Sequence, residues 1–189
     1  NYDHGQNFGN GATTIGANSQ IGKFLTEAPF NSGSSVDGTF TFTASAPVSV
    51  IALRGLTNER GEFLITTLPV SDLSVVATVE TVVFPHFADG GGWTTQIVMV
   101  NPTDEVLSGS IQFYSPGTST TPGAPATVTI AGQAASTFPY SIPVRSSRAL
   151  RTAGLGTAVQ VGSVRMIPSG TSRTPAGLGV FNFRNVSEA

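Results

Sequence analysis

Apolar and polar residues alternate with a period of two along most of the 189-residue chain. Such alternation predicts β-strands that bury one face and expose the other to water, as in antiparallel sheets. Gly, Pro and Ser clusters separate the runs at intervals of about 8–12 residues, which is typical of β-sandwiches and barrels. The expected strands are residues 38–45, 49–55, 63–70, 74–84, 96–101, 110–115, 126–130, 137–142, 158–167 and 179–185.

Helical periodicity is confined to one segment, residues 19–30. Ile21, Phe24 and Leu25 stand there at positions i, i+3 and i+4, and Pro29 ends the run. This spacing predicts one short helical turn in an otherwise all-β chain.

The chain also contains an internal repeat with loops of different length. In each copy, a Thr-Ile segment ending near a Pro leads to a strand that starts with Gly, and a further Pro precedes a strand that ends in Arg. The matched pairs are residues 14–30 with 129–144, 38–42 with 162–166, and 47–54 with 175–184.

The repeat predicts two units of unequal completeness. Residues 75–189 have the length of one Ig-like sandwich, about 100 residues, whereas residues 1–72 form a partial, related unit with an extended N-terminal tail. The first unit lacks counterparts of the strands between Phe84 and Ser115, so its core and edges would stay open. An upstream segment, a strand from another copy or the second unit itself would complete it.

Composition narrows the class of protein. Charged residues make up 11% of the chain, against about 25% in typical globular domains, so the surface is mostly uncharged and polar, as in many secreted β-proteins. A net charge of −2 without a basic cluster argues against nucleic-acid binding. No apolar run is long enough to span a membrane. No signal peptide opens the chain, and we expect an extracellular or cell-surface location with any such peptide removed.

The sequence contains few of the residues and motifs that catalysis or cofactor binding requires. The chain has no Cys and only two His, His4 and His86, which rules out an ordinary structural zinc site. It has no G-x-S-x-G elbow, no dinucleotide fingerprint and no evident carboxylate pair. The sequence therefore predicts a protein that is not an enzyme and holds no cofactor.

The most unusual stretch is "FPHFADGGGWTTQIVMVNPTDE", residues 84–105. One hypothesis is a calcium site with Asp89, Asp104 and Glu105 as oxygen ligands, although no Asp-rich calcium loop is present. The favoured interpretation is structural. The "DGGG" segment is a turn that needs positive φ, Trp93 is a core or edge anchor of the next strand, and "NPTD" is a second turn.

Two further segments concentrate charge. The "NERGE" segment, residues 58–62, is expected to be a hairpin loop with Gly61 at positive φ, and the alternative is a docking contact through Arg54 or Arg60. The "RSSRALR" segment is expected to be a solvated loop, or a site for an acidic neighbour or anionic glycan. Its arginines are Arg145, Arg148 and Arg151.

The stretches "LRGLTNERGEFLITTLPV", "FPHFADGGGWTTQIVMVNPTDEVLSGSIQFY" and "AGLGVFNFRN" together resemble a module that recurs in tandem in large secreted proteins of environmental bacteria. The resemblance covers most of the chain and is weakest over residues 1–13. It implies an extracellular Ig-like or fibronectin-like β-sandwich repeat and brings no catalytic residues.

These observations lead to one functional hypothesis and one rival. The first is a non-catalytic structural module, a repeat or subunit of a bacterial surface filament or stalk that assembles with other copies or neighbouring repeats by β-strand complementation. The tail with Tyr2 and Phe8 is a candidate inserted segment. The rival is a carbohydrate-binding or adhesin module, which predicts Trp93, Tyr114 and Tyr140 exposed on one face.

Overall fold

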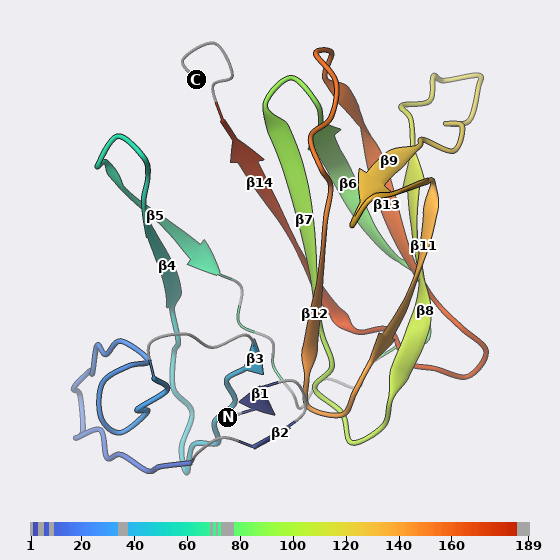
Figure 1. Ribbon diagram of the computed structural model, residues 1–189. Coiled ribbons are helices and arrows are strands. Elements are labelled where there is room, and N and C mark those ends of the chain that lie inside the picture. The colour runs from blue at the N-terminus through green and yellow to red at the C-terminus, as the bar shows by residue number, and fades with distance from the viewer. Residues whose placement is uncertain are drawn as a thin grey trace. The chain divides into compact units, whose positions relative to one another are not determined.

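The computed structural model describes residues 2–3, 6–7, 10–33, 38–68, 70, 72 and 78–184 (Figure 1). All regular elements in these residues are β-strands, and the described residues contain no helix, which confirms the all-β prediction. The chain divides into two compact units, residues 1–40 together with 77–189, and residues 41–76. The predicted units, residues 1–72 and 75–189, were defined by repeated sequence. The division of the structure into compact units does not test that repeat.

The larger unit contains a β-sandwich with two antiparallel sheets (Figure 1). The four-stranded sheet has the order β11-β8-β13-β6, the three-stranded sheet has the order β12-β7-β14, and β9 and β10 form a small separate hairpin. The strands are β6 (Val82–Asp89), β7 (Trp93–Val100), β8 (Leu107–Tyr114), β9 (Val128–Ile130), β10 (Gln133–Ala135), β11 (Thr137–Ile142), β12 (Ser147–Arg151), β13 (Gln160–Pro168) and β14 (Ala176–Phe183).

The core lies between the two sheets and follows the period-two pattern. In β11, Phe138, Tyr140 and Ile142 are buried and the residues between them are exposed. Phe113 stands at right angles to Phe87, with ring centroids 5.2 Å apart, and to Phe138 at 6.1 Å. Edge-to-face pairs of this kind add about 0.5–1.5 kcal/mol each beyond the area that they bury, so three aromatic rings fix the centre of the core.

The "FPHF" motif breaks the alternation, and the structure shows why. Phe84 and Phe87 are both buried, although alternation would place them on opposite faces. Gly162 of β13 pairs with Phe87 and Val164 pairs with Phe84, so Pro85 and His86 together oppose a single residue, Ser163. This β-bulge inserts one extra residue and restores Phe87 to the core. Pro85 suits the position because it has no backbone N–H to donate.

The chain enters the sandwich at one end and leaves it at the other. β7 follows β6 through a tight turn and runs back along the sandwich, and β14 is antiparallel to β7. The arrows of β6 and β14 consequently point to the same end (Figure 1). In the immunoglobulin fold the first two strands share a sheet, whereas here β6 and β7 lie in different sheets. The Ig-like part of the prediction therefore stays unconfirmed.

The N-terminal segment departs from the predicted elements. Residues 38–45 were expected as a strand, but only β3 (Gly38–Thr39) forms, pairing with β1 (Tyr2–Asp3), which also pairs with β2 (Gln6–Asn7). The helical turn expected in residues 19–30 is wrong. Hydrogen-bonded turns occupy residues 25–30 instead, and the Glu27 carboxylate accepts the N–H of Phe24. Pro29 cannot donate the backbone hydrogen bond that would continue a helix.

Two of the strands from β6 to β14 were missed. The "RSSRALR" segment, expected to be a loop, contains β12, which pairs with β7 along its whole length. Among the five residues of β12 only Leu150 is both apolar and buried, so the hydrophobic pattern is too weak to reveal the strand. β10 was missed because its residues, Gln133–Ala135, carry no bulky apolar side chain.

Candidate functional site

The smaller unit is built around a two-stranded hairpin of β4 (Ala52–Thr57) and β5 (Phe63–Leu68). The strands are antiparallel and in continuous register, from Ala52 opposite Leu68 to Thr57 opposite Phe63. In the described residues neither strand has a second neighbour. Within this part of the chain each strand has one edge without a partner, and a two-stranded hairpin by itself is only marginally stable in water.

The turn of the hairpin is tightly built, as predicted for "NERGE". The side-chain oxygen of Asn58 accepts the N–H groups of Arg60 and Glu62 at 3.0 and 2.9 Å, and its amide donates to the Glu62 carboxylate. Gly61 has φ of 76°, which confirms the expected conformation. Arg60 forms an exposed ion pair with Glu62. The turn therefore joins the two strands through contacts that are local in sequence.

One face of this hairpin is apolar and exposed. Alternation places Ile51, Leu53, Phe63 and Ile65 on the same face, and the exposed fractions of these side chains are 77%, 59%, 68% and 60%. Gly55 lies between them, and the ring of Phe63 covers its backbone. Lone exposed apolar residues are ordinary, but a contiguous set of large ones marks an interaction surface. We call these four residues the hairpin face.

The internal repeat indicates which neighbouring strand β4 lacks. If Arg54 corresponds to Arg184, then Leu53 corresponds to Phe183 and Ile51 to Phe181. In β14 the ring of Phe183 packs on Trp93 at 4.9 Å, and that of Phe181 lies 5.5 Å from His86. β14 also pairs along its whole length with β7. In the described part of the chain, β4 has no neighbour that corresponds to β7.

The carboxylates proposed as calcium ligands are not brought together. The Asp89 carboxylate lies at the end of β6, is buried, and accepts the N–H of Gly154 at 2.8 Å. Asp104 and Glu105 follow the far end of β7, and a strand of eight residues spans about 25 Å. No cluster of three metal-ligating side chains occurs among the described residues. The calcium hypothesis is therefore wrong in one respect: Asp89 cannot share a metal ion with Asp104 and Glu105.

The turn interpretation of the same stretch is confirmed. Gly90, Gly91 and Gly92 all have positive φ, at 86°, 57° and 89°. Trp93 opens β7 and packs against Phe183, as expected of an anchor at the edge of the core.

The aromatic platform of the rival hypothesis does not form. Tyr140 is buried with 3% of its side chain exposed, and burial raises its pKa to about 12. Trp93 belongs to the three-stranded sheet and Tyr114 to the four-stranded sheet. The three rings therefore do not share one exposed face. Sequence could not reveal this, because the face that a strand exposes depends on the sheet it joins.

The arginines of "RSSRALR" are not gathered into one site. The guanidinium of Arg145 donates to both carboxylate oxygens of Asp104, at 2.8 and 2.7 Å, and this hydrogen bonding holds the pKa of Asp104 below its usual value. Arg151 reaches the hydroxyl of Thr94 at 3.3 Å. Arg148 is exposed on β12. Arg145 therefore pairs with an acidic residue, as one hypothesis expected, but that residue, Asp104, belongs to the same unit.

The remaining sequence candidates lie near the N-terminus and on the hairpin. Tyr2 belongs to β1, and Phe8 lies outside the described residues. Arg54 lies on β4, on the face opposite the hairpin face.

Comparisons of this chain with protein-family models, with curated proteins and with solved structures find no match. The resemblance to tandem secreted modules therefore stays a prediction. Within the described residues, no helix is long and apolar enough to cross a membrane.

Proposed function

We propose that this chain is a non-catalytic, extracellular structural module, a repeat or subunit of a bacterial surface filament or stalk. Units join when a strand from a neighbouring repeat or copy pairs with the β4–β5 hairpin. The observation that carries the proposal is the hairpin face, whose four large apolar side chains are each more than half exposed and lie on or beside strands that have no second neighbour among the described residues. Covering that face and pairing an edge would bury apolar surface and form backbone hydrogen bonds in one event.

The path of the chain through the sandwich supports the same proposal. Because β6 and β14 run in one direction, the chain enters the sandwich at one end and leaves it at the other, and tandem copies of the sandwich would follow one another end to end. Units joined in this way extend a row by about one sandwich length each, which suits a stalk or filament. The scarcity of charge on the chain supports the extracellular part of the proposal, because such polar, uncharged surfaces are frequent in secreted β-proteins.

The proposal is tested by the assembly state of the purified chain. Light scattering over a range of protein concentrations, with negative-stain microscopy, should show oligomers or fibres that grow with concentration. The double variant Leu53→Asn with Ile65→Asn should reduce the apparent association constant by at least about tenfold, because each truncation of a buried contact removes on the order of 1 kcal/mol or more.

The matched control is Leu155→Asn, which makes the same chemical change at a loop residue of similar exposure, 66%. Its assembly should equal that of the unmodified chain. A chain that remains a 19 kDa monomer at every concentration, or a control as impaired as the double variant, contradicts the proposal.

A further inference from the structure

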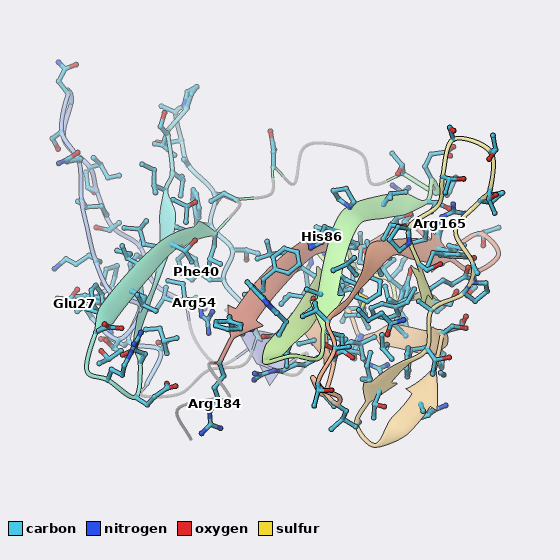
Figure 2. The ribbon with its side chains drawn as sticks, turned by 90° about the horizontal axis from the view of Figure 1, so that it is seen from above. Glu27, Phe40, Arg54, His86, Arg165 and Arg184 are labelled. Atoms are coloured by element: carbon cyan, nitrogen blue, oxygen red, sulfur yellow. The ribbon has the colours of Figure 1, made fainter. Side chains whose placement is uncertain are left out.

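A groove crosses the outer face of the four-stranded sheet, on the side away from the core. Its volume is about 550 Å³, and it is open to solvent along much of its length. The floor is formed by Pro85 of β6, Tyr114 of β8, and Ser163 and Arg165 of β13, and one wall is formed by residues 115–117, 122 and 123. Figure 2 labels Arg165 and His86, which line the groove from neighbouring strands. Of these residues, only Tyr114 was singled out from the sequence, as one of three aromatic residues expected to contact a carbohydrate.

The wall of the groove is held in place by its own hydrogen bonds. Ser115 donates its N–H to the carbonyl of Ala124 at 2.8 Å, and its hydroxyl accepts the N–H of Ala124 at 3.1 Å. Thr118 and Thr121 close the tip through a backbone bond of 2.8 Å, and a β-bridge joins Tyr114 to Pro125. A loop fastened at its base and its tip keeps its shape when a ligand arrives, so less conformational entropy is lost on binding.

Arg165 is the charged group on the floor of the groove. Its guanidinium lies over the ring of Tyr114, 4.6 Å from the centroid, and the hydroxyl of Tyr114 is fixed in turn by Gln112 at 2.7 Å. Among the described residues Arg165 has no carboxylate partner, unlike Arg60 and Arg145. Stacking on the ring orients the planar guanidinium. Its N–H groups stay available to an anion, in a chain whose net charge is −2.

We propose that this groove binds an acidic saccharide, a sugar that carries a carboxylate. Arg165 pairs with the carboxylate in a bidentate manner, Tyr114 and Pro85 contact the apolar face of the sugar ring, and Ser163 and His86 bond its hydroxyls. This site lies apart from the hairpin face and does not depend on the proposed structural function.

The surroundings favour a sugar over other anions. Both strands beneath Arg165 and Tyr114 are paired on their two sides, β8 with β11 and β13, and β13 with β8 and β6. The floor therefore offers no free backbone edge on which an extended acidic peptide could add a strand. A single arginine also suits one carboxylate better than a phosphate, which is usually held by several donors or by a helix N-terminus.

The test is an NMR titration of the full chain with digalacturonate, followed by amide shifts. We expect shifts at the groove residues. Arg165→Gln should weaken binding by about tenfold or more, since a charge-assisted bond is lost. Arg165→Lys should recover only part of the affinity, because lysine cannot bind in a bidentate manner. The matched control Arg148→Gln removes the same charge from the other sheet and should bind normally.

Neutral galactobiose and inorganic phosphate serve as probes of the ligand class, and both should produce much smaller shifts than digalacturonate. The proposal is overturned if digalacturonate produces no shifts, if Arg148→Gln weakens binding as much as Arg165→Gln, or if either probe matches digalacturonate.

Discussion

At the residue scale, the side-chain amide of Asn101 ties three segments of the sandwich together. It is fully buried, and its nitrogen lies 2.7, 3.1 and 2.9 Å from the carbonyl oxygens of Glu105, Ile142 and Pro143. Its oxygen accepts the N–H and the hydroxyl of Thr103. The sequence predicted a turn at "NPTD" but gave no sign that its first residue also holds the end of β11.

We expect Asn101→Ala to lower the free energy of unfolding by about 2–3 kcal/mol, because it removes the bonds to three carbonyl groups, of which that of Ile142 is buried. Asn101→Asp should be at least as harmful, since a carboxylate would face the same carbonyl oxygens. Urea denaturation measures both effects. Asn182→Ala, a half-buried position on β14, is the control and should cost less than about 1 kcal/mol. Equal losses for the two alanine variants would contradict this role of Asn101.

Tyr140 supplies a second prediction at this scale. Its buried hydroxyl has no hydrogen-bond partner among the described residues, and an unsatisfied hydroxyl opposes folding. Tyr140→Phe should therefore be as stable as the unmodified protein at pH 7, or more stable by about 1 kcal/mol.

The pKa of Tyr140 gives this prediction a dependence on pH. Burial raises the pKa from 10.0 to about 12 in the folded protein. Above pH 10 the phenol of Tyr140 ionises in the unfolded chain but stays neutral in the folded chain. The free energy of unfolding therefore falls as the pH rises from 10 to 12. The unmodified protein should lose on the order of 2–3 kcal/mol more than Tyr140→Phe across this window. Tyr114→Phe is the control, and an identical pH profile for Tyr140→Phe and the unmodified chain would contradict the prediction.

At the scale of elements, the turn between β6 and β7 depends on glycine. Gly92 has φ of 89°, and a Cβ atom there would overlap the carbonyl oxygen of Arg184. The N–H of Arg184 also donates to the carbonyl of Gly92 at 2.9 Å. The turn before β7 thus contacts Arg184, the residue that follows β14.

Gly92→Ala should consequently destabilise the sandwich by at least about 3 kcal/mol, through backbone strain and displacement of Arg184. Gly170→Ala is the matched control, because Gly170 also has positive φ, 54°, but has open space around its Cα. We expect about 1 kcal/mol or less there. Thermal unfolding followed by circular dichroism compares the two, and similar losses would show that φ alone, without the contact, sets the cost.

Elements with a strong local signal were predictable, and elements defined by their neighbours were not. The turns at "NERGE" and "DGGG" follow from glycine and from Asn58, whose partners lie within four residues. β12 and the bulge at Pro85 and His86 follow from pairing with β7 and β13, which are distant in sequence. Residues 40–51, despite their alternating pattern, form no strand in the structure, since alternation creates a strand only where a partner accepts its hydrogen bonds.

At the scale of the whole molecule, the composition and the period-two pattern by themselves determined an all-β chain with antiparallel sheets, and the repeat predicts an incomplete first unit. Only the tertiary structure decided which faces are exposed. It buried Tyr140, separated Asp89 from Asp104, gathered Arg165 and Tyr114 in one groove and left the hairpin face open. The physical reason is that alternation fixes which residues share a face of a strand, whereas the sheet that covers that face comes from residues far along the chain.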